Sequence, residues 1–302
     1  MSDRFWEELQ QTAGKEQCFR QENMSAHTTF KVGGPAEYFA CPKRERIPAI
    51  VALCKRYEIP WHVIGNGSNL LVADEGISGL VIEIGRECAQ VAVQGNVIKA
   101  QAGALLSVTA AKAAEHGLTG MEFASGIPGS VGGAVVMNAG AYGGEMKQIV
   151  TGATVLTREG AEKALSLDEL DFGYRHSSIP QLHGIVLDVE FTLCQGEMET
   201  IREQMAELRR KRSEKQPLEY PSAGSTFKRP EGYFAGKLIQ DAGLRGYRVG
   251  DAQVSEKHCG FVINRGNATA SQIHQLICDV QEKVKEQFGV DLKTEVRFLG
   301  NF

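Results

Sequence analysis

The chain has 302 residues, of which 42% are hydrophobic, and a formal net charge of −4. This length allows about two or three domains, each with a core of its own. A general nucleic-acid binder or a protein of membrane surfaces would normally carry a basic excess. The charge therefore argues against both classes and favours small soluble partners.

No apolar run approaches the ~20 residues that a membrane helix needs, and Phe5-Trp6-Glu7-Glu8 stands where a signal peptide would have its apolar core. We therefore expect a cytoplasmic protein without membrane insertion. Scattered cysteines without a C-x-x-C pair predict reduced, mostly buried thiols. His176 has no second ligand at metal-binding spacing, so we expect it to form local hydrogen bonds and expect no metal site.

The first hundred residues mix helices and strands. Phe5 and Leu9 mark a short amphipathic segment, and glycine interrupts a strand-like run at 28–36. Apolar residues at helical spacing predict a helix over 47–57, followed by a strand over 61–64, which suggests a βαβ-like unit.

The middle of the chain is richer in strands. The pattern predicts a hairpin over 91–100 and a small-residue helix over 106–116 that Gly117 ends. Further strands follow, with a capping box at Ser166 and Glu169, and the alternating apolar residues of 185–193 predict a strand that covers a core.

A helix through Ile201 and Met205 is expected to end in the basic run 209–212. We interpret this run as a solvated helix end, and attraction of a phosphate-rich substrate is the alternative. The C-terminal part should hold two helices, alternating with strands. These helices are expected near 238–242 and 273–284, and the strands at 261–264 and 294–299.

Two glycine-rich loops are the first candidates for a binding site. Gly65-Asn66-Gly67-Ser68-Asn69 follows an apolar strand, and its glycines would let successive N–H groups turn toward one anion such as a pyrophosphate. The loop matches neither a Walker loop nor G-x-G-x-x-G, and an ordinary strand-end turn is an equal alternative. The second loop is Gly126-Ile127-Pro128-Gly129-Ser130-Val131-Gly132-Gly133-Ala134, which leads to Met137-Asn138-Ala139-Gly140-Ala141-Tyr142. So many small residues cost backbone entropy, so we favour a ligand that approaches this backbone closely over a merely tight loop.

Three polar positions could act on a substrate. Ser225 follows Gly224 in a segment without a histidine base, which suits a proton donor better than an acyl nucleophile. Arg175 could hold a carboxylate with two hydrogen bonds, although most arginines are solvated. Glu295 lies on a predicted strand whose alternation separates Glu295, Arg297 and Leu299 from Val296 and Phe298; a site and an ordinary exposed ion pair are equal alternatives there.

Six ordered motifs resemble the UDP-N-acetylenolpyruvoylglucosamine reductase family. They are T-T-x-x-x-G-G-P-A at 28–36, G-N-G-S-N at 65–69, G-I-P-G-S-V-G-G-A with N-A-G-A-Y at 126–142, Y-R-x-S at 174–177, A-G-S-x-F-K at 223–228 and E-V-R-F at 295–298. The chain is similar to the shorter class of the family, because no segment matches the tyrosine-bearing loop of the longer class.

The resemblance implies an α+β protein. Its expected parts are a vanillyl-alcohol-oxidase/PCMH-type FAD-binding fold in two subdomains, 1–86 and 87–212, with the FAD domain itself over about 31–196, and a C-terminal α/β substrate domain, 213–302. Covalent members of that superfamily carry a flavin-linking histidine in the first loop. Here Asn66 and Ser68 occupy the loop, which implies non-covalent FAD.

The implied activity is reduction of the enolpyruvyl ether of UDP-N-acetylglucosamine-enolpyruvate, with NADPH as co-substrate, in peptidoglycan precursor synthesis by a monomer. Arg175 and Glu295 match the residues that stabilise the enolate-like intermediate, and Ser225 matches the proton donor. The expected FAD contacts are Gly65, Asn66, Gly67, Ser68, Asn69, Gly126, Pro128, Gly129, Ser130, Gly132, Gly133, Asn138, Gly140 and Ala141. The expected substrate contacts are Tyr174, Lys228, Arg229 and Arg297, where Arg229 replaces an asparagine of the longer class.

Two other functions remain open at this point. One is a flavin oxidase of the same superfamily, against which the A-G-S-x-F-K and E-V-R-F motifs count. The other is a non-catalytic protein that binds nucleotide sugars and keeps the loops only as a phosphate cradle.

Overall fold

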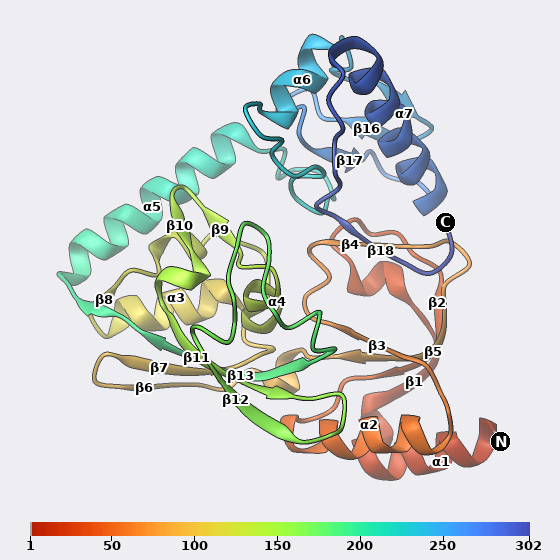
Figure 1. The fold of residues 1–302 in the computed structure, drawn as a ribbon, viewed down its shortest axis with the longest axis vertical. Coiled ribbons are helices and arrows are strands. Elements are labelled where there is room, and N and C mark those ends of the chain that lie inside the picture. The colour runs from red at the N-terminus through yellow and green to blue at the C-terminus, as the bar shows by residue number, and fades with distance from the viewer. Residues whose placement is uncertain (1) are drawn as a thin grey trace. The chain divides into compact units, whose positions relative to one another are not determined.

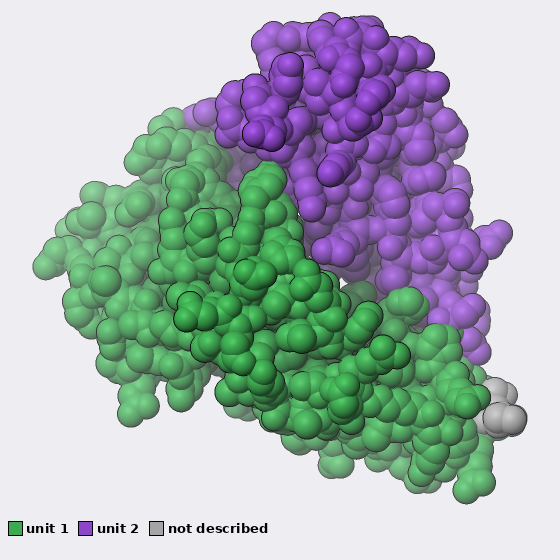
Figure 2. Space-filling model, in the orientation of Figure 1, with its two compact units in different colours: residues 1–20, 38–66, 79–211 green, residues 21–37, 67–78, 212–302 purple. Residues whose placement is uncertain are grey.

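The computed structural model describes residues 2–302 and divides into two compact units (Figure 1, Figure 2). The first unit comprises residues 1–20, 38–66 and 79–211 and the second residues 21–37, 67–78 and 212–302. Two short N-terminal segments, 21–37 and 67–78, thus belong with the C-terminal residues. The division into family domains at 86 and 212 stays a prediction, because compact units need not coincide with such domains.

The α-helices are separated mostly by runs of consecutive β-strands, which fits the α+β class. The helices are α1 Ser2–Ala13, α2 Ile47–Arg56, α3 Leu106–Glu115, α4 Val131–Val136, α5 Met198–Lys215, α6 Ala235–Asp241 and α7 Ala270–Phe288. The strands are β1 Cys18–Asn23, β2 Pro35–Ala40, β3 Trp61–Ile64, β4 Leu70–Val72, β5 Ile77–Glu83, β6 Val91–Gln94, β7 Val97–Gln101, β8 Leu118–Thr119, β9 Gly140–Ala141, β10 Gly144–Glu145, β11 Val150–Leu156, β12 Glu162–Ser166, β13 Ile185–Thr192, β14 Cys194–Gln195, β15 Arg248–Val249, β16 Ala252–Val254, β17 Val262–Asn264 and β18 Arg297–Leu299.

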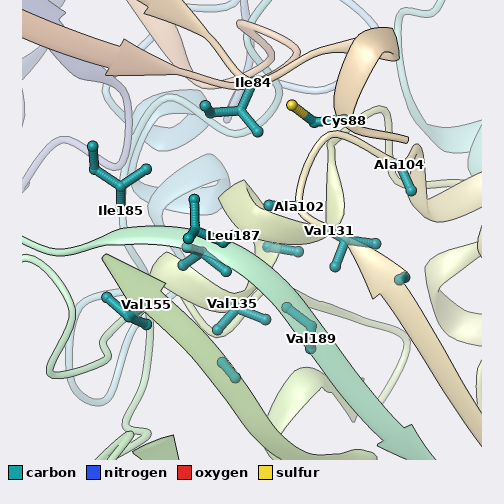
Figure 3. Close-up of a cluster of buried hydrophobic side chains, with 14 of the residues drawn as sticks. Ile84, Cys88, Ala102, Ala104, Val131, Val135, Val155, Ile185, Leu187 and Val189 are labelled. Atoms are coloured by element: carbon teal, nitrogen blue, oxygen red, sulfur yellow. The ribbon is translucent and has the colours of Figure 1, made fainter. Parts of the chain in front are cut away.

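The first unit is built on a sheet of order β12-β11-β13-β7-β6 with antiparallel neighbours. The alternating residues of β13 are buried as predicted, because Leu187 and Val189 share the face that meets a helix. Figure 3 shows these two side chains beside Val131 and Val135 of α4. The packing fixes the start of α4, and the second glycine-rich loop leads into that start.

A second sheet has the order β1-β2-β5-β3, with β3 parallel to β5. The predicted helix and strand are both confirmed as α2 and β3, but β5 lies between β2 and β3 in the sheet. Phe5 and Leu9 of α1 are fully buried, and α1 packs on α2. The strand β3 ends at Ile64, directly before the first glycine-rich loop.

The second unit has a small antiparallel sheet of order β15-β16-β17 that packs on α7. The apolar stripe of α7, Ile273 to Val284, is buried as predicted. Thr269 and Gln272 form a capping box at the start of α7, and Gly289 ends it with φ 67°. The other predicted C-terminal helix is α6, so both helices are confirmed.

Some predicted boundaries differ. The helix expected to end at 209–212 continues to Lys215 as α5. The seven cysteines are free thiols, and burial raises the pKa of Cys18, Cys54 and Cys88 to about 12. Within residues 2–302, helices long and apolar enough to cross a bilayer are absent, as are groups of three or more His, Cys, Asp or Glu that could ligate a metal.

Asp74 anchors the segment 67–78 within the second unit. Its Oδ1 accepts a hydrogen bond from the N–H of Ala270 at 2.7 Å, and its Oδ2 accepts from the N–H and the hydroxyl of Ser271 at 2.8 and 2.6 Å. The carboxylate thus satisfies free N–H groups at the start of α7. Burial acts to raise the pKa of Asp74, but these hydrogen bonds outweigh it and hold the pKa below its usual value.

Asp74→Ala should lower the free energy of unfolding by about 1 kcal/mol at neutral pH, because the first turn of α7 loses its acceptors. The folded pKa is lowered, so the stabilisation is complete above the ordinary pKa of about 3.9 and is lost as pH falls through the folded value. Denaturant melts of both proteins at a series of pH values measure this. The exposed neighbour variant Glu75→Ala is the control, and an equal loss there or a pH-independent difference would contradict the anchor.

Candidate active site

The first half of the G-N-G-S-N loop lies against the second glycine-rich loop inside the first unit. The Nδ2 of Asn66 donates to the carbonyl of Pro128 at 2.8 Å. A Cβ on Gly65 would lie only 2.3 Å from the hydroxyl oxygen of Ser130. The loops that the sequence assigned to one ligand are therefore adjacent at these four residues.

The second half of the loop lies against the T-T motif in the second unit. Gly67 has φ 58°, and a Cβ there would lie 1.9 Å from the carbonyl oxygen of His27, so glycine is required by the chain itself. The N–H of Thr29 donates to the Gly67 carbonyl at 3.2 Å.

Thr29 is a candidate ligand contact that the sequence reasoning missed. Its hydroxyl oxygen is buried and has no hydrogen-bond partner among residues 2–302. A buried hydroxyl in this state costs free energy unless a bound group satisfies it. The T-T motif was the available signal, but its residues were given no role.

Two adjacent glycines of the second loop have different reasons to be glycine. Gly132 donates its N–H to the Ala102 carbonyl at 2.8 Å, and a Cβ would meet the Ala102 Cβ at 2.7 Å. Gly133 is exposed, and its Cβ would meet only the Ser130 hydroxyl, at 3.4 Å. Glycine inside a helix costs about 1 kcal/mol relative to alanine. Gly132 is explained by packing. Gly133 donates its N–H to the Ser130 hydroxyl at 3.4 Å, but the space beside its Cα is open, as the close approach of a ligand requires.

Asn138 joins the flavin-type segment to the turn that carries Arg175. Its side chain is fully buried, and its Nδ2 donates to the Glu145 carboxylate and the Gly173 carbonyl, each at 2.9 Å. Its Oδ1 accepts from the N–H of Lys147 at 2.9 Å. This side chain is therefore committed to protein contacts, and its predicted role toward FAD stays a prediction.

Gly140 and Ala141 form β9, which pairs with β10. A Cβ on Gly140 would lie 2.6 Å from the Gly144 carbonyl oxygen, so the hairpin requires glycine there. The Gly140 carbonyl accepts from the Arg175 guanidinium at 3.3 Å. The remaining loop members, Gly126 and Gly129, lie before α4, and Leu106 donates to the Gly129 carbonyl at 3.0 Å.

Arg175 occupies a tight turn in which Gly173 and His176 exchange backbone hydrogen bonds of 3.1 and 3.2 Å. Its φ is 52°, in the left-handed region that favours glycine. The guanidinium carbon lies 5.3 Å from the ring of Tyr174, which is 55% exposed. Local backbone preference therefore does not explain an arginine at this position.

Ser225 lies on a segment held by its buried neighbour Thr226. Ser225 forms a backbone bridge with Phe261, and the Thr226 N–H donates to the Gly260 carbonyl at 2.9 Å. The Thr226 hydroxyl accepts from the Val262 N–H at 3.0 Å. Ser225 itself is exposed. The Ser225 hydroxyl is therefore exposed on a backbone that hydrogen bonds hold in place.

Glu295 lies beside the same segment. The N–H groups of Glu295 and Val296 both point to the Thr226 carbonyl, at 2.8 and 3.5 Å. Two successive donors on one acceptor form a bulge. The regular alternation predicted for 294–299 is therefore wrong: Val296 is buried, whereas Phe298 is 38% exposed and stacks edge-on with His274.

The predicted substrate contacts fall on both units. Lys228 continues the Ser225 segment and donates its N–H to the Lys293 carbonyl at 2.8 Å. The Arg229 guanidinium lies 4.0 Å from the Phe234 ring. Arg297 is exposed on β18. The structure thus groups Ser225, Lys228, Glu295 and Arg297 on two neighbouring segments of the second unit, while Tyr174 and Arg175 belong to the first.

Comparison with known proteins decides the family. Residues 216–299 match the C-terminal domain of UDP-N-acetylenolpyruvoylglucosamine reductase, and residues 35–166 match an FAD binding domain. The reductase of that name from Agathobacter rectalis is 59% identical over 295 residues, 94% of each chain. This chain belongs to the UDP-N-acetylenolpyruvoylglucosamine reductase family.

Solved structures agree with that assignment. The UDP-N-acetylenolpyruvylglucosamine reductase from Thermus caldophilus has a TM-score of 0.80 and 39% identity, covering 92% of this chain and 97% of its own. A 4-ethylphenol oxidase from Gulosibacter chungangensis, 14% identical with a TM-score of 0.51, covers 97% of this chain and 65% of its own and shares the fold alone. The predicted FAD-binding fold of the oxidase superfamily is confirmed, and the family binds FAD.

The residues present fit that cofactor. The hydroxyl of Thr29, in the second unit, has no partner among residues 2–302, and the space beside the Cα of Gly133, in the first unit, is open. The chain itself fills the space beside Gly65, Gly67 and Gly132, whereas the space beside Gly133 suits the close approach of a ligand.

Gly133→Ala should keep or raise the melting temperature of the flavin-free protein, since alanine favours the helix. It should weaken FAD binding by about 1–3 kcal/mol, because a methyl group intrudes where ligand meets backbone. Flavin released by acid precipitation measures occupancy. Gly132→Ala is the matched control and should instead destabilise the chain through its contact with Ala102. Unchanged FAD affinity in Gly133→Ala would remove Gly133 from the site.

Proposed function

We propose that this protein reduces the enolpyruvyl ether of UDP-N-acetylglucosamine-enolpyruvate to UDP-N-acetylmuramate, with NADPH as electron donor. The proposal follows the family and its FAD binding domain. The reaction belongs to peptidoglycan precursor synthesis, and we propose that the protein carries it out as a monomer in the cytoplasm.

One observation in the structure supports the chemistry most directly. A hydroxyl and a carboxylate that match the family motifs, Ser225 and Glu295, lie on two segments that hydrogen bonds of Thr226 and Lys228 join. Hydrogen bonds hold the backbone of both segments, so the backbone does not have to become ordered during the reaction. Such preorganisation is what stabilises developing charge in an enzyme.

Bound FAD supplies hydride transfer, from NADPH to the enolpyruvyl group. We propose that it is held without a covalent bond by residues 65–68 and 126–133 and by the Thr29 hydroxyl. Gly140 and Ala141 are further proposed contacts.

We propose that Arg175 stabilises the negative charge that builds beside the substrate carboxylate when hydride adds to the methylene carbon. A guanidinium offers a fork of N–H donors that matches a carboxylate. The left-handed backbone of Arg175 supports a functional reason for the residue, because strain of this kind persists where the side chain is needed. Tyr174, Lys228, Arg229 and Arg297 are proposed to contact the substrate.

Ser225 is the proposed proton donor, and Glu295 is proposed to assist Arg175 in stabilising the charge by donating a hydrogen bond from a protonated carboxyl group. An alcohol is a weak acid, so it can protonate only a strongly basic partner. The carbanionic carbon beside the carboxylate is such a partner. A fixed hydroxyl at this position would deliver the proton without a histidine.

The alternatives differ in simple measurements. Under anaerobic conditions the reductase binds flavin, which NADPH reduces once, and it continues to oxidise NADPH only while the enolpyruvyl sugar nucleotide is supplied. A flavin oxidase would instead pass electrons from an alcohol to oxygen, and a binding protein would bind the nucleotide sugar without NADPH oxidation. Failure of the enolpyruvyl substrate to reoxidise NADPH-reduced protein would overturn the proposed function.

Arg175→Gly should leave the flavin-free protein as stable or more stable by up to about 1 kcal/mol, because glycine suits φ 52°. Flavin reduction by NADPH should stay near the wild-type rate. Flavin reoxidation by substrate should slow about 10²–10³-fold, since charge develops only in that step. Stopped-flow absorbance separates the two half-reactions, and Arg175→Lys should give an intermediate rate. Equal slowing of both halves would contradict a role confined to the substrate.

Ser225→Ala should bind FAD, accept electrons from NADPH and bind substrate, yet slow the substrate half-reaction about 10²–10⁴-fold through loss of a positioned acid. Ser225→Cys should recover part of the rate, since a thiol can also give up a proton. Ser222→Ala, in the same segment, is the matched control and should react normally. Normal turnover in a stable Ser225→Ala protein would leave water as the proton source.

A further inference from the structure

The two asparagines of the G-N-G-S-N loop have different partners. Asn66 donates from its carboxamide to the Pro128 carbonyl in the second glycine-rich loop, at 2.8 Å. Asn69 donates from its Nδ2 to the Glu295 carbonyl at 3.0 Å. Its own backbone carbonyl accepts from the Arg297 N–H at 2.9 Å. Asn69 therefore brackets the peptide units on both sides of Val296.

Asn69 acts on irregular backbone. The chain at Glu295 leaves the regular ladder, because both Glu295 and Val296 donate to the Thr226 carbonyl. Regular pairing resumes only at Arg297, whose partner across the parallel β4–β18 pair is Leu70. A bulge turns side chains to a new direction and needs contacts that fix it. The Nδ2 of Asn69 contacts the bulge on the carbonyl of Glu295 itself.

The segment 67–78, to which Asn69 belongs, is itself fixed in the second unit. It directly precedes β4, and two residues after β4 Asp74 is hydrogen-bonded to the start of α7. The backbone of Glu295 is thus held at its N–H by Thr226 and at its carbonyl by Asn69. A side chain on a peptide held at both ends has a defined starting direction.

We infer that Asn69 is a positioning residue for Glu295 rather than a flavin contact. This inference rests on the proposed function, in which Glu295 stabilises charge on the substrate. Asn69 orients the carboxylate through the Glu295 carbonyl and itself touches neither substrate nor flavin through its side chain. Of the two carboxamides in this loop of five residues, that of Asn66 thereby holds the second glycine-rich loop and that of Asn69 holds the backbone of Glu295.

The test compares three single variants: Asn69→Ala, the isosteric Asn69→Asp and the matched control Asn66→Ala. Asn69→Ala is also combined with Glu295→Gln in a double variant. Flavin content, melting temperature and the two half-reaction rates are measured for each protein. Asn69→Ala should keep its flavin and its rate of reduction by NADPH. Its reoxidation by substrate should slow about 10–100-fold, the scale of a small misplacement of a catalytic group.

Asn69→Asp keeps the size of the side chain but has no N–H to donate when ionised. It should be slow at neutral pH and recover as pH falls and the carboxyl becomes a donor. In the Glu295→Gln background, Asn69→Ala should slow reoxidation less than threefold further, because residues acting through one another are not additive. Asn66→Ala should instead lose flavin, with both half-reactions falling in step with flavin content.

Several results would overturn the inference. One is loss of flavin, or equal slowing of both half-reactions, in both Asn69 variants. A second is that Asn69→Ala slows reoxidation in the Glu295→Gln background as much as it does alone. A third is selective slowing of reoxidation in Asn66→Ala. The single variant Glu295→Gln is measured first, because a normal substrate half-reaction there rejects the proposed role of Glu295 itself. That result is distinct from an additive double variant, which rejects only the link to Asn69.

Discussion

Thr226 is the residue on which the arrangement of the second unit's polar groups depends. It is fully buried, and its N–H, carbonyl and hydroxyl are all engaged, with Gly260, Glu295 and Val262. Each such hydrogen bond contributes about 1 kcal/mol net, but leaving one of these buried groups unpaired would cost more. The segments of Ser225 and Glu295 therefore keep one relative position, and an acid and a carboxylate from distant parts of the sequence share one rigid support.

Much of the fold was predictable because its elements follow simple periods. The apolar residues of 185–193 alternate strictly, and those of 273–284 recur at helical spacing, so β13 and α7 were both expected. The bulge at Glu295 was not, because the letters of E-V-R-F-L alternate as a regular strand would. The bulge arises because two successive N–H groups donate to the carbonyl of Thr226, a residue far earlier in the chain, and sequence alone does not show that contact.

The candidate site shows the same limit at finer scale. Sequence marks Gly132 and Gly133 alike, yet one is needed by Ala102 and the other by nothing in the chain. It also marks Asn66 and Asn69 alike, although their carboxamides serve different segments. Residue type and spacing identify a loop, but the partner of each side chain depends on which distant backbone the fold places beside it.

The segments 21–37 and 67–78 have a consequence for exchanging parts between relatives. The C-terminal unit takes β4, the cap of α7 and the carbonyl of Phe30 that accepts from Asn264 from these two early pieces of the chain. A chimera joined at residue 212 would combine α7 of one parent with the Asp74 of another. Residues that contact each other across these segments must therefore come from the same parent. A functional hybrid has to exchange residues 21–37 and 67–78 together with 212–302.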